Sequence, residues 1–481
     1  MQSSRPLKRT KIVATLGPAS FDEVTLRQMI LAGLDVVRIN FSHAVHEQLL
    51  PVLERIRRIS KELKVAIGIL GDLRGPRIRV GRFPGGVVQL ETGSEIILAP
   101  GATLALPGVI PVSHTGMAND VKPGSLVLLD DGNLEARVIE VTSDGKIRCS
   151  VIRGGPLKDN KGINLPGTRV SLPALTQKDF ADVDFAIANN FDFLALSFVQ
   201  TAADVLDLRQ HLKAAGSNIG IVSKIENKSS IDDIEAIARE SDAVMVARGD
   251  LALEVSFSDV PLAQKRIINV CRQAATPVIT ATQMLESMIT VHKPTRAEAA
   301  DVANAILDGT DAVMLSAESA AGKYPVESIA TMSEIAQRTE FALKSKEVPA
   351  MPPLQVVSQL EPTVGHAAQM IASTLDAKVI VTATTSGATA RRVACHRPQI
   401  PIIALVSNPA TARSLRLCWG VESVLTEEIL GTNQLVRMAL AQSVKLYGAK
   451  NGDIVTITAG TPFSTRGTTN LIKVERVVDE S

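Results

Sequence analysis

The sequence predicts an α/β protein with a parallel (β/α)₈, or TIM, barrel, a small β-barrel inserted after its third strand, and a C-terminal α/β domain. The first observation is that short apolar runs, typical of buried parallel strands, alternate with amphipathic runs from residue 11 to residue 319. The second is that this alternation provides eight strands, the number that closes such a barrel. A doubly wound open sheet would also fit the alternation, but the number eight favours the barrel.

The eight predicted strands are separated by amphipathic segments such as Glu23–Gly33, Ser229–Glu240 and Pro294–Gly309. In chain order the strands are Lys11–Gly17, Leu34–Ser42, Val65–Leu73, Phe191–Val199, Ile219–Glu226, Ala243–Leu251, Pro277–Leu285 and Ala312–Ser319. Active sites of these barrels lie at the carboxyl ends of the strands. The polar residues that end each run are therefore the first candidates for function.

Residues 77–172 interrupt the alternation with a different pattern. Their strand-type runs are broken by Asp-Gly pairs, as at Asp131-Gly132, which is a strong hairpin signal. We interpret this segment as a small β-barrel inserted at the catalytic face, where insertions often act as lids. Lys158–Gly167 would form the returning hinge, and the main barrel would occupy residues 1–76 and 173–346.

Residues 350–481 follow a linker-like break and predict a separate α/β domain with a mixed sheet. Its strand candidates are Lys378–Thr384, Pro401–Ser407, Asp453–Gly460 and Asn470–Val478. After the first of these, a Ser/Thr/Gly turn leads into a helix, a geometry that binds phosphate through backbone N–H groups. An ordinary capped helix start would have the same composition. The candidate residues are Thr384, Thr385, Ser386, Gly387, Ala388 and Thr389.

Composition and charge exclude several classes of protein. Only 3% of the residues are aromatic, so we expect no base-stacking surface for nucleic acid. The formal net charge is +1, so an anionic ligand must be held by locally placed cations. No apolar run approaches the length of a membrane span. The four cysteines form no close pair, which is typical of reduced thiols. We therefore expect a cytoplasmic protein with neither nucleic-acid nor membrane partners.

The stretch Ile221–Glu254 contains the strongest chemical signal. Lys224 and Glu226 stand at i and i+2 of one predicted strand and so share a face, and Asp250 follows the next strand. Mg²⁺ takes one or two protein carboxylates and leaves its other positions to water and substrate oxygens, so this pair of acids could hold a metal against an anionic substrate. Gly249 would let the backbone approach that substrate closely. An internal Lys-Glu-Asp ion-pair network would explain the same residues.

Other strand ends also carry polar side chains. Arg38, Asn40 and Ser42 occupy alternate positions of the second strand and so lie on one face. Arg38 suits a phosphate, because its guanidinium is a planar and permanently charged fork. Thr282 and Ser316 end two later strands, where a hydroxyl can bind a carboxylate or relay a proton.

Eight motifs, in this order, resemble the pyruvate kinase family over essentially the whole chain. They are KIVATLGPAS, VVRINFSH, KGINLPG, IVSKIEN, VMVARGDLALE, ATQMLESM, PTRAEAADVANAILDG and GTTNLIKV. The resemblance implies transfer of the phosphoryl group of phosphoenolpyruvate to ADP, giving pyruvate and ATP, the last step of glycolysis. It also implies a lid, a C-terminal domain that can take a phosphorylated effector, and a homotetramer.

Carried over residue by residue, the resemblance assigns roles at the strand ends. Glu226 and Asp250 match the protein ligands of a divalent metal, Mg²⁺ or Mn²⁺. Lys224 matches the lysine that neutralises charge on the transferring phosphoryl group and the enolate oxygen, and Arg38 matches the phosphate-binding arginine. These roles agree with the residue types, because phosphoryl transfer needs positioning and electrostatic compensation more than covalent chemistry.

The resemblance also assigns the carboxylate and nucleotide contacts. The backbone of Gly249 and Asp250, together with Thr282, matches the clamp for the substrate carboxylate. The positions that match the nucleotide side are Thr15, His43, Arg79 and Lys161.

The sequence departs from the family at one informative place. Members that need K⁺ usually have Asp-Thr-Lys-Gly-Pro-Glu where this chain has Asp72-Leu73-Arg74-Gly75-Pro76-Arg77. Asn40, Ser42 and Asp72 still offer oxygens, but Leu73 offers no side-chain oxygen. Arg77 places a fixed cation where those members have an acid. We therefore hypothesise that the Arg77 guanidinium replaces K⁺ and that K⁺ is not required.

Two other functions fit part of the pattern. A Mg²⁺-dependent barrel lyase or aldolase acting on pyruvate or oxaloacetate would share the metal site of Glu226 and Asp250. It would need neither the lid nor Lys161, so nucleotide binding discriminates. A non-catalytic, metabolite-sensing homologue would have no use for Lys224 and Arg38 together.

Overall fold

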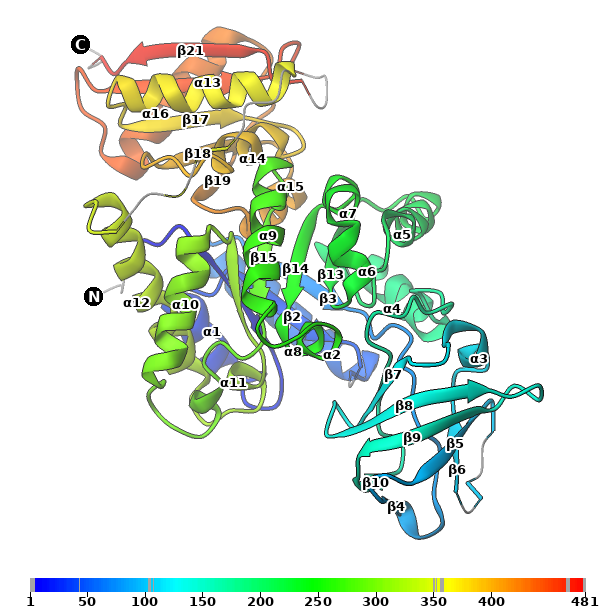
Figure 1. The fold of residues 1–481 in the computed structure, drawn as a ribbon. Coiled ribbons are helices and arrows are strands. Elements are labelled where there is room, and N and C mark those ends of the chain that lie inside the picture. The colour runs from blue at the N-terminus through cyan, green and yellow to red at the C-terminus, as the bar shows by residue number, and fades with distance from the viewer. Residues whose placement is uncertain are drawn as a thin grey trace.

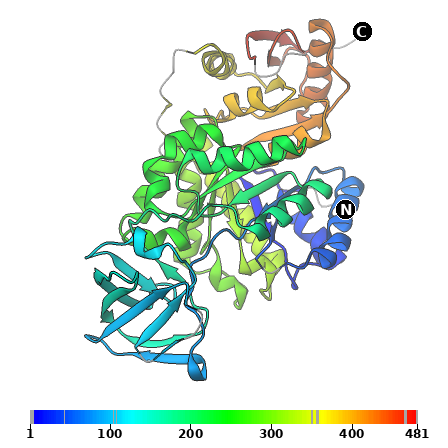
Figure 2. The same ribbon diagram turned by 90° about the vertical axis from the view of Figure 1, so that its right-hand side faces the viewer.

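The computed structural model describes residues 5–42, 44–102, 105–106, 108–348, 351, 353–354, 359–463 and 468–478. A central barrel has the insertion at one end and the C-terminal domain at the other (Figures 1 and 2). Within these residues, no helix is both long enough and apolar enough to cross a membrane.

Eight parallel strands close a barrel in the order β1-β16-β15-β14-β13-β12-β3-β2, which confirms the predicted fold class. The strands are β1 (Lys11–Thr15), β2 (Val36–Asn40), β3 (Gly68–Asp72), β12 (Phe193–Leu196), β13 (Gly220–Ile225), β14 (Ala243–Ala247), β15 (Val278–Ala281) and β16 (Ala312–Leu315). The helices of this part are α1 (Glu23–Ala32), α2 (His46–Leu63), α4 (Gln177–Ala188), α5 (Ala202–Ala214), α6 (Lys228–Asp232), α7 (Ile234–Glu240), α8 (Arg248–Glu254), α9 (Val260–Gln273), η2 (Glu286–Ile289), α10 (Arg296–Asp308), α11 (Ala317–Ala320) and α12 (Pro325–Lys344).

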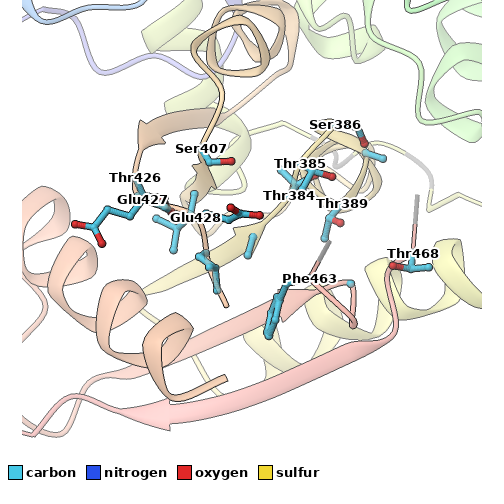
Figure 3. A pocket seen from close by; sticks show the side chains of 15 residues that line it. Thr384, Thr385, Ser386, Thr389, Ser407, Thr426, Glu427, Glu428, Phe463 and Thr468 are labelled. Carbon is cyan, nitrogen blue, oxygen red and sulfur yellow. Dashed lines mark hydrogen bonds between the residues drawn. The ribbon is translucent and has the colours of Figure 1, made fainter. Parts of the chain in front are cut away.

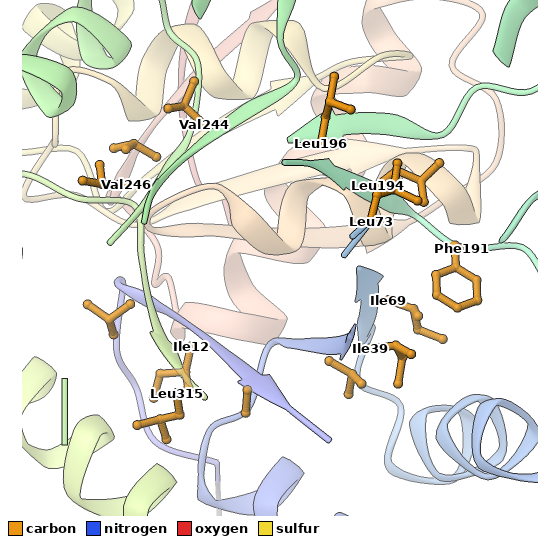
Figure 4. Packing of buried hydrophobic residues seen from close by; sticks show 14 of the residues in the cluster. Ile12, Ile39, Ile69, Leu73, Phe191, Leu194, Leu196, Val244, Val246 and Leu315 are labelled. Carbon is orange, nitrogen blue, oxygen red and sulfur yellow. The ribbon is translucent and has the colours of Figure 1, made fainter. Parts of the chain in front are cut away.

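Strand side chains alternate between two buried environments. Val13 and Leu70 belong to the cluster that fills the barrel, and Leu417 of the C-terminal domain joins the same cluster. The intervening residues, such as Ile12, pack between the strands and the helices (Figure 4). Leu73, a predicted site residue, is 1% exposed and belongs to this outer cluster. Because both faces are buried, the strands are continuous apolar runs and only their ends carry polar function.

One boundary error affects the site. The predicted strand Ala243–Leu251 ends at Ala247, and α8 begins at the next residue. Gly249 and Asp250 therefore lie in the first helical turn, where backbone N–H groups have no partner within the helix.

The insertion after β3 consists of short strands around a core of its own. A six-stranded sheet has the order β11-β7-β8-β9-β5-β6, and β10 pairs separately with β4. The elements are η1 (Pro84–Gly86), β4 (Val87–Leu90), β5 (Glu95–Pro100), β6 (Val109–Val112), α3 (Met117–Asp120), β7 (Leu126–Leu129), β8 (Leu134–Val141), β9 (Ile147–Arg153), β10 (Gly155–Lys158) and β11 (Ile163–Asn164). One apolar cluster, which includes Leu98 and Val138, lies between them.

The C-terminal domain contains the predicted mixed sheet, in the order β19-β18-β17-β20-β21 with β21 antiparallel. Its elements are α13 (Leu360–Thr374), β17 (Val379–Ala383), α14 (Ala388–Ala394), β18 (Ile402–Val406), α15 (Pro409–Ser414), η3 (Leu415–Leu417), β19 (Val421–Leu425), α16 (Thr432–Tyr447), β20 (Ile454–Ala459) and β21 (Leu471–Arg476). The strand β19 was not predicted, because Glu422 and Ser423 interrupt its apolar run and only Val421 is buried.

Candidate active site

Polar side chains from distant parts of the chain meet at the carboxyl ends of adjacent strands. β1, β2 and β3 are neighbours in the barrel, and β12 lies between β3 and β13. Strand register places Arg38 opposite Thr15 and Asn40 opposite Asp72. The closed barrel thus brings these residues and the end of β13 to one rim.

A continuous series of contacts crosses this rim. Arg38 donates from Nε to Asp72 Oδ2 at 2.7 Å and from Nη1 to Thr15 Oγ1 at 2.8 Å. Lys224 Nζ lies 3.4 Å from Asp72 Oδ1 and 2.7 Å from Glu226 Oε1. We call the series Thr15–Arg38–Asp72–Lys224–Glu226 the charge ladder. The structure therefore joins two predicted cations and a predicted metal ligand through Asp72.

The charge ladder is mostly buried. The side chains of Asp72 and Glu226 are 3% and 2% exposed, whereas those of Arg38 and Lys224 are each 12% exposed. A buried charge is costly unless it is paired, so each member depends on its neighbours. The two cations keep part of their surface open, from which they can reach a ligand.

Burial and pairing set the charge of each member. Burial opposes ionisation of Asp72, yet Lys224 and Arg38 hold the pKa of Asp72 below its ordinary value. Burial would likewise lower the pKa of Lys224, but Asp72, Glu226 and Asp250 outweigh it and raise that pKa above its ordinary value. Lys224 is consequently a fixed cation at neutral pH.

Glu226 and Asp250 fit a hard divalent cation. Burial and the nearby Asp250 raise the pKa of Glu226, with Lys224 opposing them, and a bound cation would relieve this repulsion. Glu226 Oε2 accepts the Phe198 N–H at 2.9 Å, which fixes the carboxylate in place. The described residues contain no group of three or more His, Cys, Asp or Glu side chains that could hold a metal. A cation between Glu226 and Asp250 would take its remaining ligands from water and substrate.

Arg248 shapes the rim between β14 and β15. Its guanidinium donates to the Thr282 carbonyl at 2.6 Å and pairs with Asp301 at 2.8 Å. Thr282 has a φ of 66°, which a β-branched residue rarely adopts. Thr282 Oγ1 accepts the Gly249 N–H at 2.9 Å, so the strained threonine faces the first turn of α8.

Ser316 directly follows β16, which lies next to β1 in the barrel. Its N–H donates to Glu318 Oε2 at 2.7 Å, and Glu318 Oε1 accepts the Leu285 N–H at 3.2 Å. Glu318 is buried and ties together the loops after β15 and β16. Sequence reasoning missed this role and that of Arg248, because each side chain acts on the backbone of another loop. The signal available for both was a charged residue within an otherwise apolar or small-residue run. The role of Phe198 was also missed, and nothing in the sequence indicates it, because only its backbone N–H is involved.

The predicted nucleotide residues are divided between the barrel and the insertion. The Arg79 backbone pairs with the residue after Lys161, and Lys161 Nζ lies 2.7 Å from Asp130 Oδ1. Neither side chain has a hydrogen bond or ion pair with Thr15 in the part of the chain that the structure describes. His43 lies outside the described residues.

Three of the predicted monovalent-cation residues gather on the ends of β2 and β3. Asn40 Oδ1 accepts the Ser42 N–H at 3.0 Å, and Asn40 lies in register with Asp72. The Arg77 side chain does not join these three residues but points to the insertion. This side chain is 38% exposed and lies 3.1 Å from Asp131 in the insertion.

A cleft lies between the barrel rim and the insertion. Its walls include Arg77, Asn164, Asp250 and Glu254. Burial raises the pKa of Glu254 to about 7, although hydrogen bonds from Gly167 and Asn164 oppose this shift. Sequence reasoning missed Glu254, since nothing in the sequence indicates that the last residue of α8 faces the predicted hinge.

The predicted phosphate loop lines a separate cavity in the C-terminal domain, which we call the effector cavity (Figure 3). The loop residues that line it are Thr384, Thr385, Ser386, Ala388 and Thr389. Gly387 has a φ of 83°, which glycine adopts without strain, at the start of α14. Glu427 and Glu428 lie across the cavity and were not predicted.

The fold and the charge ladder define a (β/α)₈ barrel protein with buried, paired charges at the carboxyl ends of its strands, where enzymes of this fold have their active sites. The family model of the pyruvate kinase barrel domain matches residues 7–329, and that of the pyruvate kinase alpha/beta domain matches residues 362–475. The chain belongs to the pyruvate kinase family.

Individual proteins similar to this chain belong to the same family. The chain is 44% identical over 475 residues to the pyruvate kinase of Staphylococcus epidermidis and 43% identical over 475 residues to that of Staphylococcus aureus. Each alignment covers 98% of this chain and 81% of the relative. The crystal structure of a pyruvate kinase from Cryptosporidium parvum superposes with a TM-score of 0.89 at 36% identity, over 98% of this chain and 96% of that one.

Proposed function

We propose that this chain is an active pyruvate kinase, which transfers the phosphoryl group of phosphoenolpyruvate to ADP and yields pyruvate and ATP. The charge ladder carries the proposal, because it sets a fixed cation, Lys224, between two carboxylates and beside Arg38. The predicted lyase or aldolase and the non-catalytic homologue lose support, since both family models and the full-length relatives are pyruvate kinases.

The two cations of the ladder would face the phosphoryl group. An ADP oxygen attacks phosphorus, the bond from phosphorus to the enolate oxygen breaks, and the electron pair stays on that oxygen. Arg38 would hold the phosphate through its fork, and Lys224 would neutralise the charge that develops on the phosphoryl and enolate oxygens. Its raised pKa supports this electrostatic role over a role as base.

The substrate carboxylate would bind at the start of α8. The N–H groups of Gly249 and Asp250 lack partners within the helix there, and the Gly249 N–H donates to the Thr282 hydroxyl, which the substrate carboxylate would join or displace. Ser316 would contribute its hydroxyl from the neighbouring strand as a proton relay.

Glu226 and Asp250 would hold Mg²⁺ or Mn²⁺, which when bound offsets the charge of the phosphoryl oxygens. The nucleotide would lie between Thr15, His43, Arg79 and Lys161. Movement of the insertion toward the barrel would bring these residues together and exclude water, which otherwise competes for the phosphoryl group.

We further propose that K⁺ is not required and that Arg77 replaces it. Two observations support this: Leu73 is buried and has no side-chain oxygen, and Arg77 lines the same cleft as Asp250. As the insertion moves, the Arg77 guanidinium would leave Asp131 and enter the monovalent-cation site.

We also propose regulation by a ligand and assembly into an oligomer. The hydroxyl-rich effector cavity supports binding of a phosphorylated effector. Family membership supports a homotetramer and action in the cytoplasm, where the substrates of glycolysis are found.

One assay separates the proposal from its alternatives. The purified chain with Mg²⁺, phosphoenolpyruvate and ADP should form pyruvate and ATP in equal amounts. Omission of ADP should stop both products. Pyruvate formation from oxaloacetate without nucleotide, with none from phosphoenolpyruvate, would favour the lyase and refute the kinase.

A further inference from the structure

The helix α4 holds the loop after β2 from outside the barrel. It is the first helix after the insertion, and the charge ladder contains none of its residues. Lys178, in its first turn, donates from Nζ at 3.0 Å to the carbonyl of Phe41, the residue directly after β2. A side chain outside the ladder therefore supports the backbone at the rim.

A second residue of α4 holds the same loop where it enters α2. Asp182 Oδ1 lies 2.8 Å from Nε2 of His46, the first residue of α2, and Asp182 Oδ2 accepts Lys178 Nζ at 2.6 Å. Because a carboxylate can only accept a hydrogen bond, His46 Nε2 carries the proton of this contact. Lys178 and Asp182 are one turn apart on α4, so together they hold both ends of the loop.

Burial makes Asp182 the centre of this arrangement. Its side chain is 1% exposed, whereas those of Lys178 and His46 are 41% and 30% exposed. A buried carboxylate is costly unless it is paired, so Asp182 keeps both partners close to it. Lys178 is consequently directed to the Phe41 carbonyl although it lies partly in solvent.

Aromatic contacts restrict the same two ends of the loop. The His46 ring stacks on Phe185 of α4, with centroids 4.2 Å apart and ring planes inclined by 12°. The Phe41 ring meets His46 and Phe185 edge-on, at 6.0 and 6.2 Å. Stacked and edge-on pairs are favourable, so they oppose rotation of either ring.

The helix also holds the neighbouring loop after β3. Asp179 Oδ1 accepts the Gly75 N–H at 3.1 Å, and the Phe41 N–H donates to the Asp72 carbonyl at 3.0 Å. We call Lys178, Asp179 and Asp182 the α4 clamp. It sets the loops after β2 and β3 against each other at one side of the rim.

We propose that the α4 clamp positions these two loops for the nucleotide, with Lys178 and Asp182 as positioning residues for ADP. This inference rests on the proposed function, which assigns nucleotide contacts to both loops, at His43 and at Arg79. The clamp residues act through the backbone and His46 and do not touch the reacting atoms. Displacement of a binding loop by about 1 Å is enough to weaken the contacts that it carries.

Calorimetric titration of the full chain in Mg²⁺, with ADP and separately with phosphoenolpyruvate, tests the clamp without turnover. Lys178→Met is the principal variant, because a half-exposed side chain can be replaced without disturbing the core. His46→Leu releases the other end of the loop. Lys178→Arg and His46→Gln each keep a hydrogen-bond donor. Lys213→Met, at an exposed lysine of α5, is the matched control.

Lys178→Met and His46→Leu should each weaken ADP binding by about fivefold to tenfold. Binding of phosphoenolpyruvate should stay within about threefold, because its proposed contacts Lys224 and Thr282 lie on strands that the clamp does not touch. Lys178→Arg and His46→Gln should restore most of the ADP affinity, and Lys213→Met should leave both ligands unaffected.

Three results would overturn the inference. Equal losses of both ligands would show that the clamp only stabilises the barrel. A loss in Lys178→Met without one in His46→Leu would show that the lysine itself contacts ADP. Unchanged ADP binding in both variants would refute the positioning role and leave the proposed function intact. Absence of ADP binding by the unmodified chain, in contrast, would refute the proposed function together with this inference.

Discussion

Asp72 joins the two cations of the charge ladder. It accepts Arg38 on one oxygen and approaches Lys224 with the other, while almost completely buried. At the scale of single residues, the chemistry depends on this pairing, since Asp72 offsets the charge of Arg38 and shares with Glu226 the charge of Lys224. Residue type alone identified Asp72 only as a possible oxygen donor for K⁺. Its bridging role requires three strands that are brought together only by closure of the barrel.

The monovalent-cation hypothesis is tested at Arg77. Turnover of the unmodified chain should persist when K⁺ is replaced by tetramethylammonium, because a guanidinium supplies the positive charge. Arg77→Glu should remove that charge and make activity depend on K⁺ by about tenfold or more. Steady-state rates at a fixed ionic strength provide the measurement. Collapse of the unmodified enzyme without K⁺ would contradict the hypothesis.

Glu254 should make stability depend on pH. Its folded pKa of about 7 exceeds the ordinary value of 4.5, so the folded chain binds this proton more tightly than the unfolded chain. That stabilisation is complete below the ordinary value and is lost as the pH rises through about 7. The Glu254→Gln variant has no carboxyl to ionise, so its free energy of unfolding should not fall over this pH range. Between the ordinary value of 4.5 and about 7 it should become more stable than the unmodified chain by up to about 3 kcal/mol.

Urea unfolding in EDTA at a series of pH values measures this difference. Glu91→Gln, at an exposed glutamate, is the matched control and should follow the unmodified chain. Parallel pH profiles for the Glu254→Gln variant and the unmodified chain would show that Glu254 titrates normally.

At the scale of elements, the apolar runs predicted all eight barrel strands because buried parallel strands have few alternatives. Strand ends were less predictable. Arg248 looked like the end of a strand, but it begins α8 by turning its guanidinium back onto the loop after β15. The predicted helix Ser229–Glu240 is divided at Asp233, and β19 was missed as a half-exposed strand. These details depend on contacts between elements, which the spacing of apolar residues along the sequence does not reveal.

Close packing within β3 leads to a prediction for Gly71. A Cβ there would lie 2.4 Å from Phe41 Cε2 and 3.2 Å from Leu194 Cδ2. Gly71→Ala should therefore lower the free energy of unfolding by about 1–3 kcal/mol, as overpacked cores do. Urea unfolding gives the value. Gly162→Ala, where a Cβ would meet no atom closer than 3.6 Å, should change it by less than about 0.5 kcal/mol, and equal effects would argue against the packing account.

At the scale of the whole molecule, Asp35 links three parts of the chain. It pairs with Arg5 at 2.8 Å and with Lys8, both in the N-terminal segment, and with Arg416 of the C-terminal domain. The side chains of Asp35 and Arg416 are 2% and 1% exposed. Burial opposes its ionisation, but Lys8, Arg5 and Arg416 hold the pKa of Asp35 well below its ordinary value. The base of the barrel is thereby fastened to the domain that contains the effector cavity.

Asp35→Asn should be among the most destabilising single changes. It would leave several buried cations without their shared carboxylate, at a cost of about 3–5 kcal/mol. The loss should be measured by urea unfolding near neutral pH and should shrink in acid, where the unmodified chain also begins to lose the charge. A variant as stable as the unmodified chain would mean that water or Glu422 compensates the cations.

The most direct test of the catalytic account compares Lys224→Met with Lys228→Met, an exposed lysine four residues further on. Pyruvate formation from phosphoenolpyruvate and ADP should fall by about a thousandfold in Lys224→Met, because the charge on the phosphoryl and enolate oxygens is no longer neutralised. Affinity for Mn²⁺ should stay within about tenfold, since Glu226 and Asp250 remain. Lys228→Met should have nearly normal turnover. Nearly normal turnover in Lys224→Met would contradict the account.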